Sequence, residues 1–166
     1  MKRIKDNHGF TLIELMMVIA VIGILAMVLI PKISAMKITA QESGIDANIR
    51  IVEAQVTALI NKYGTDEISD FEAKVAEKLE GNIINPFTKK DKVGTYDDSD
   101  AKKEAVIYST GDNKAPNDEE LFKAWDNDKD RKGSVAYGAF EEDDQLKCII
   151  FGYDSVGNKI GRVTVE

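Results

Sequence analysis

The stretch GFTLIELMMVIAVIGILAMVLIP, residues 9–31, decides the fold of this chain. From Phe10 to Ile30 it runs for 21 residues, of which only Glu14 is charged. As a helix with a rise of about 1.5 Å per residue, this run would be about 32 Å long, close to the ~30 Å hydrocarbon core of a bilayer. The sequence therefore predicts a membrane-spanning helix that carries one carboxylate near its start.

A short basic leader precedes the apolar run. Lys2, Arg3 and Lys5 favour an N-terminus that stays in the cytoplasm, with the bulk of the chain on the other side of the membrane. An ordinary secretory signal places its small-residue cleavage site after the apolar segment. Here the small residue, Gly9, stands before that segment, which argues against both an ordinary signal and an uncleaved anchor.

Glu14 lies one helical turn inside the apolar run. A carboxylate near the end of a span can extend its side chain to the headgroups, whereas one at the centre costs about 2.5–3.5 kcal/mol. The alternative is a functional carboxylate that a positive group neutralises. Cleavage between Gly9 and Phe10 would create such a group, the α-amine of Phe10, within reach of Glu14 in its own chain or in a neighbour. Ionisable residues inside spans are functional by default, which favours this alternative.

Gly23 and Pro31 interrupt the otherwise uniform apolar helix. Glycine lets helices approach closely in a membrane. Proline removes one backbone N–H and clashes with the preceding turn. We therefore expect a bend near residues 27–31.

The string GFTLIEL, the basic leader, the 21-residue span and the proline at its end resemble a type IV prepilin. The resemblance covers about residues 1–40, and the pseudopilins of type II secretion share the motif. It implies that a prepilin peptidase cleaves between Gly9 and Phe10 and N-methylates Phe10. It further implies that Glu14 is the assembly carboxylate and that the helix packs in the core of a filament.

Beyond Pro31 the apolar residues form a stripe on one helical face. Ile38, Ile45, Ile49, Val52 and later positions to Tyr63 recur at spacings of 7, 4 and 3, which predicts an amphipathic helix. We predict four segments: a cleaved leader (1–9), a transmembrane assembly helix (10–30), its amphipathic continuation (31–63) and an α/β head (64–166).

The head is predicted to be an antiparallel sheet of three or four strands laid on the amphipathic helix, so the fold class is α+β and pilin-like. Two helices are expected within it: one at about 70–80 capped by Ser69-x-x-Glu72, and a short one begun by Asn117 that buries Leu121, Phe122 and Trp125. An exposed loop is expected at 88–103. Strands are expected at 106–110, 135–140, 146–153 and 160–165.

The composition narrows the chemistry of the head. His8, in the leader, is the one histidine, and Cys148 is the one cysteine. The head therefore lacks the residues that hydrolytic triads and most zinc sites require. No phosphate-binding loop or dinucleotide fingerprint occurs, and no cofactor is expected. We read Cys148 as a small buried residue. The chain has a net charge of −7 and so does not offer the basic surface that nucleic-acid binding requires. No direct nucleic-acid partner is therefore expected.

One acidic cluster, Asp126, Asp128 and Asp130, alternates as in the first half of a calcium loop. The glycine expected at the sixth position is Arg131 and the glutamate expected at the twelfth is Tyr137, so the cluster is a weak metal candidate. A solvated loop is the default interpretation, also for Asp97, Asp98 and Asp100.

These observations predict a structural subunit of a type IV pilus, not an enzyme. The resemblance implies self-polymerisation, prepilin peptidase and an assembly platform as partners, contact with lipid before assembly, and roles in surface motility, adhesion or biofilm. A pseudopilin or competence pilin of a secretion or DNA-uptake machine is the nearest alternative. A membrane-anchored binding domain is the more distant one.

Overall fold

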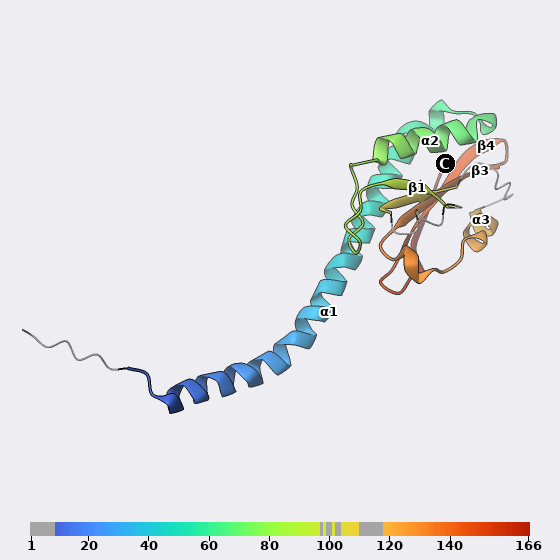
Figure 1. Ribbon diagram of the computed structural model, residues 1–166. Helices are drawn as coiled ribbons and strands as arrows, with labels where there is room; N and C mark the ends of the chain where they lie inside the picture. The colour runs from blue at the N-terminus through green and yellow to red at the C-terminus, as the bar shows by residue number, and fades with distance from the viewer. Residues whose placement is uncertain (1–8, 97, 99–100, 102–103, 110–117) are drawn as a thin grey trace, which may run out of the picture. The chain divides into compact units, whose positions relative to one another are not determined.

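The computed structural model describes residues 9–96, 98, 101, 104–109 and 118–166 (Figure 1). It divides into an N-terminal unit, Met1–Ile38, and a C-terminal unit, Thr39–Glu166, and each is described by itself. The elements are, in chain order, α1 (Leu12–Leu59), the 3₁₀ turns η1 (Ile60–Lys62) and η2 (Thr65–Glu67), α2 (Ile68–Leu79), β1 (Val93–Thr95), β2 (Val106–Tyr108), α3 (Asp118–Ala124), the 3₁₀ turn η4 (Lys129–Arg131), β3 (Val135–Glu142), β4 (Gln145–Tyr153) and β5 (Lys159–Val165).

The part of α1 in the C-terminal unit buries one face. Ile45, Ile49, Val52 and Val56 are at most 4% exposed, and they belong to the stripe predicted from their spacing. Ile38 lies outside that buried face and is 43% exposed. The α-helix ends at Leu59, and a 3₁₀ turn carries the helical backbone to Lys62. The amphipathic pattern therefore predicted both the helix and the face that it buries.

The C-terminal unit is built on a five-stranded sheet with the strand order β1-β2-β3-β4-β5. β3, β4 and β5 form the antiparallel meander that the short connections predicted. β1 and β2 instead run parallel to β3, and the sequence did not indicate this. The α+β, pilin-like fold class is confirmed, and the sheet is one strand larger than the upper estimate.

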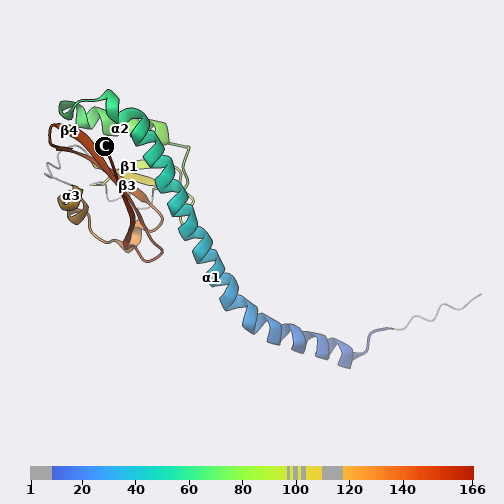
Figure 2. The same cartoon turned by 180° about the vertical axis from the view of Figure 1, so that it is seen from behind.

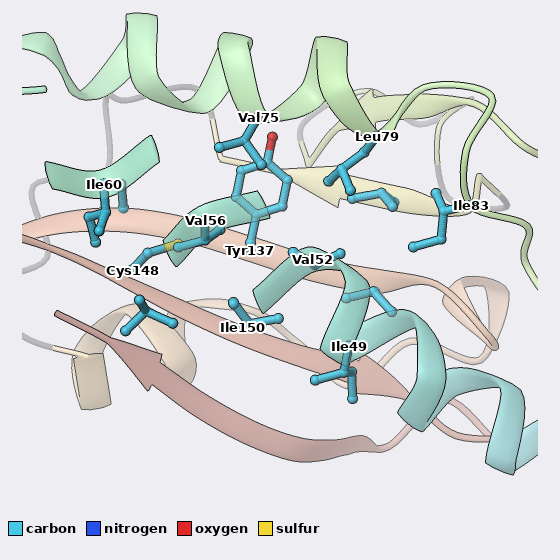
Figure 3. Close-up of a cluster of buried hydrophobic side chains, with 14 of the residues drawn as sticks. Ile49, Val52, Val56, Ile60, Val75, Leu79, Ile83, Tyr137, Cys148 and Ile150 are labelled. Atoms are coloured by element: carbon cyan, nitrogen blue, oxygen red, sulfur yellow. The ribbon is translucent and has the colours of Figure 1, made fainter. Parts of the chain in front are cut away.

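Both faces of the sheet are covered. α1 and α2 pack on the face that carries Tyr137, Cys148 and Ile150 (Figure 3). α3 and the following Trp125 pack on the opposite face, so that α2 and α3 lie on opposite sides of the sheet (Figures 1 and 2). Side chains of a strand point alternately to its two faces, so double coverage buries β3 from Val135 to Phe140 without interruption.

The predicted capping box at Ser69 is wrong. α2 begins at Ile68, and a 3₁₀ turn in which the Gly64 N–H donates to Oε2 of Glu67 (3.0 Å) leads into it. Glu72 is fully buried, and its Oε1 accepts from the backbone N–H of Ala139 (2.8 Å) and from Oγ of Ser109 (3.1 Å). These two hydrogen bonds connect α2 to the sheet. They also give a buried carboxylate the partners that buried polar groups generally have.

The segment predicted as an exposed loop, Thr88–Lys103, contains the short strand β1, so that prediction is wrong in part. Parallel pairing with β2 is a long-range contact, and the local apolar pattern does not reveal it. α3 is present, with Leu121 and Trp125 buried as predicted and Phe122 partly buried. Asn117, its expected cap, lies outside the described residues, as do Thr110, Asp97 and Asp100.

Cys148 lies on β4, between β3 and β5, and is 0% exposed, as expected for a small buried residue. Burial in an apolar environment disfavours the thiolate and raises the pKa of the Cys148 thiol well above 9.0, and the nearby carboxylate of Glu72 acts in the same direction. Tyr137, which packs in the same cluster, has a pKa raised by burial as well.

These raised pKa values predict that the fold loses stability in alkali. The unfolded chain releases the Cys148 proton near pH 9, whereas the folded chain retains it to higher pH. The contribution of this thiol to the free energy of unfolding is therefore fully present below about pH 9. Above that pH it falls by up to about 1.4 kcal/mol per pH unit. Denaturant unfolding between pH 7 and 10.5 should show a steeper loss for the wild type than for Cys148→Ala. Equal slopes for the two proteins would contradict the assignment.

Candidate functional site

The residues that the sequence singled out for processing lie ahead of the first turn of α1. Gly9, Phe10 and Thr11 are non-helical and exposed, and α1 begins at Leu12 (Figure 1). Phe10 is 87% exposed. A cleavage site needs a peptide bond that lies outside regular structure and is accessible, and the Gly9–Phe10 bond meets both conditions.

Glu14 occupies the first turn of α1 and bonds to Thr11. The backbone N–H of Thr11 donates to Oε2 of Glu14 (2.8 Å), and the Thr11 hydroxyl donates to the same oxygen (2.7 Å). The Glu14 N–H lies 3.3 Å from Oγ1 of Thr11. This is a capping box, in which the side chains at the first and fourth positions satisfy free backbone N–H groups at a helix start.

Thr11 is the site residue that the sequence reasoning missed. The pattern Thr11-x-x-Glu14 is the sequence signature of a capping box, and it stands in front of an apolar run. The structure thus brings Glu14 together with Thr11, a contact that the sequence analysis did not predict.

The helix that follows exposes apolar side chains on every side within its unit. The 18-residue window of highest hydropathy is 0% buried, with a mean hydropathy of 2.9. A core helix of similar composition would have its side chains covered by the rest of the protein. By length and composition, the helical segment Leu12–Lys62 can cross a membrane.

Gly23 and Pro31 both lie inside α1, and helical backbone continues through both of them. An added Cβ at Gly23 would meet no heavy atom within 4 Å. Ser34 donates its hydroxyl hydrogen to the backbone oxygen of Ile30 (3.3 Å), one residue before the proline. The expected bend near residues 27–31 stays a prediction.

A family model described as the prokaryotic N-terminal methylation motif matches residues 4–30. The N-terminal segment therefore carries a type IV pilin-like leader motif. Gly9, Phe10, Thr11 and Glu14 all lie inside the matched residues, together with the whole predicted span, residues 10–30. The pilin-like motif and the pilin-like fold therefore occur in the same chain.

One curated relative is similar to part of this chain. Over 53 residues the chain is 42% identical to a ComG operon protein 3 homolog from Bacillus licheniformis. The aligned part is 32% of this chain and 55% of the relative, so the chain spans about half the length of that protein. No solved structure matches significantly.

In the acidic cluster of the pilin-like C-terminal unit, the carboxylate of Asp128 has partners close to it in the sequence. Oδ1 of Asp128 accepts from the N–H of Asp130 (2.9 Å), and Oδ2 lies 3.6 Å from Nε of Arg131. The backbone N–H of Asp126 donates to the hydroxyl of Tyr96 (3.2 Å). Within the part of the chain that the structure describes, no three His, Cys, Asp or Glu side chains are grouped so that they could hold a metal ion.

Proposed function

We propose that this chain is a non-enzymatic structural subunit of a type IV pilus, made as a precursor with a cytoplasmic N-terminus and a single span in the cytoplasmic membrane. The observation that carries the proposal is the matched motif, in which an accessible Gly9–Phe10 bond precedes an apolar helix with one carboxylate in its first turn. A tether alone would need neither the glycine nor the carboxylate.

Processing is the first step of the proposed mechanism. Prepilin peptidase cleaves between Gly9 and Phe10 and methylates the new amine of Phe10, which removes the basic leader. Methylation of an amine retains its positive charge. The processed chain therefore presents a cation at Phe10 and an anion at Glu14, close together at the start of one apolar helix.

Assembly is the second step. The span lies in lipid before assembly and packs against the spans of other subunits afterwards, so its apolar side chains stay away from water in both states. The amine of Phe10 neutralises Glu14 where the two meet inside the filament, since an unpaired charge there would be costly. The filament then extends outside the cell, where it would act in surface motility, adhesion or biofilm formation.

A pseudopilin or competence pilin is the second candidate, and one observation favours it. The relative with 42% identity carries the name ComG operon protein 3 homolog, and this similarity favours a competence pseudopilin. Both candidates share the processing and assembly steps. They differ in whether the chain is an abundant component of long surface filaments or part of a short structure that serves another machine.

Substitution of Gly9 tests the processing step. An added Cβ at Gly9 or at Gly23 meets no heavy atom within 4 Å, so the described structure has room for a Cβ at both positions. In a host with an active peptidase, Gly9→Val should keep the precursor mass, whereas Gly23→Ala should lose the leader as the wild type does. Intact mass spectrometry of the membrane fraction measures this. Full processing of Gly9→Val at the Phe10 position would overturn the assigned site.

A further inference from the structure

Thr11 determines where the carboxylate of Glu14 lies. Both donors of Thr11, the backbone N–H and the hydroxyl, bond to one oxygen, Oε2, at 2.8 and 2.7 Å. Among the described residues, no hydrogen bond to the other oxygen, Oε1, is present. An ionised carboxylate has about four acceptor positions, so Oε1 can take a further donor while Oε2 stays bound to Thr11.

The contact with Thr11 survives the proposed cleavage. Hydrolysis of the Gly9–Phe10 bond converts the N–H of Phe10 into an amine, but the N–H of Thr11 remains the amide that follows Phe10. Thr11 therefore has the same two donors in the precursor and in the processed chain. Cleavage at the next bond would turn the N–H of Thr11 into an amine and change the contact.

We propose that Thr11 is a positioning residue for assembly: it holds Glu14 through Oε2 and leaves Oε1 open to the amine of a second copy of this chain. The inference rests on the proposed function and deepens it. A free glutamate side chain loses rotamer freedom when it binds a partner, and a side chain already held in one orientation loses less. Thr11 and Glu14 are both exposed, so a neighbouring helix can reach them.

Thr11→Val tests this role, because valine has the shape of threonine and lacks its hydroxyl. Thr11→Ser is the matched control that restores the hydroxyl. Each variant is expressed as the full chain with a tagged wild-type copy, and incorporation into sheared filaments is measured as a ratio to that copy. We expect normal cleavage in both variants, a several-fold lower incorporation of Thr11→Val, and near-normal incorporation of Thr11→Ser.

A spectroscopic measurement separates positioning from a general effect on the helix start. The infrared difference spectrum between the purified chain and its Glu14→Gln variant isolates the carboxylate band of Glu14. Thr11→Val should shift this band and Thr11→Ser should not. An unshifted band, or a shifted band with unchanged incorporation, would overturn the positioning role alone. Failure of the wild-type chain itself to enter filaments would instead refute the proposed function, and with it any assembly role of Thr11.

Discussion

Glu14→Ala is expected to leave cleavage and membrane insertion intact and to lower incorporation into filaments by about 100-fold or more. Removal of one partner from a buried charge pair costs about 3–5 kcal/mol, because the other charge remains without compensation. In the variant, the amine of Phe10 would be that uncompensated charge. Each factor of ten corresponds to about 1.4 kcal/mol, which gives the expected magnitude.

The variant is co-expressed with a tagged wild-type chain. Incorporation is measured as the ratio of variant to wild type in sheared filaments, divided by the same ratio in the membrane fraction. Glu14→Gln is the matched control, since it keeps the size of the side chain and an oxygen acceptor but removes the charge. We expect it to fail nearly as severely as Glu14→Ala. Wild-type incorporation of both variants would show that Glu14 has no part in assembly.

Asn85→Ala is expected to destabilise the C-terminal unit by about 3 kcal/mol or more. Asn85 is 0% exposed and joins three segments of the chain. Its Nδ2 donates to the backbone oxygens of Glu104 and Lys132, both at 3.1 Å, and its Oδ1 accepts from the N–H groups of Phe87 (2.8 Å) and Thr88 (3.0 Å). Alanine would leave buried partners unsatisfied, at about 1–3 kcal/mol for each such group.

Asn82→Ala is the matched control, because Asn82 is exposed and its side-chain amide donates to the nearby backbone oxygens of Lys78 (3.0 Å) and Glu80 (3.5 Å). Asn82→Ala should change the free energy of unfolding by no more than about 0.5 kcal/mol. Denaturant unfolding of the full chain in detergent, followed by the fluorescence of Trp125, measures both variants. Similar stabilities of the two variants would contradict the central role of Asn85.

Local patterns predicted much of the fold. The apolar run and the stripe that follows it are periodic, and periodicity reports directly on helix and on the buried face. The strands β3, β4 and β5 follow one another through short connections, which predict antiparallel neighbours. Trp125 and Leu121 were placed in the core from the same kind of pattern, and the structure buries both of them.

Non-local features were not predictable in this way. β1 is three residues long and pairs in parallel with β2, a contact that local sequence does not encode. Glu72 matched a helix-start pattern but lies buried between α2 and the sheet, where Ala139 and Ser109 bond to it. The same pattern at Thr11 and Glu14 is a true capping box. A four-residue motif alone does not distinguish these two environments.

The most direct measurement of the central proposal is the intact mass of this chain in filaments sheared from the cell surface. The account predicts that the chain is abundant in that fraction and that its mass corresponds to a start at Phe10 with one additional methyl group. Its presence there as the full-length precursor beginning at Met1, or its confinement to the membrane fraction after complete processing, would contradict the assignment as a pilus subunit. The second of these results would favour the pseudopilin alternative.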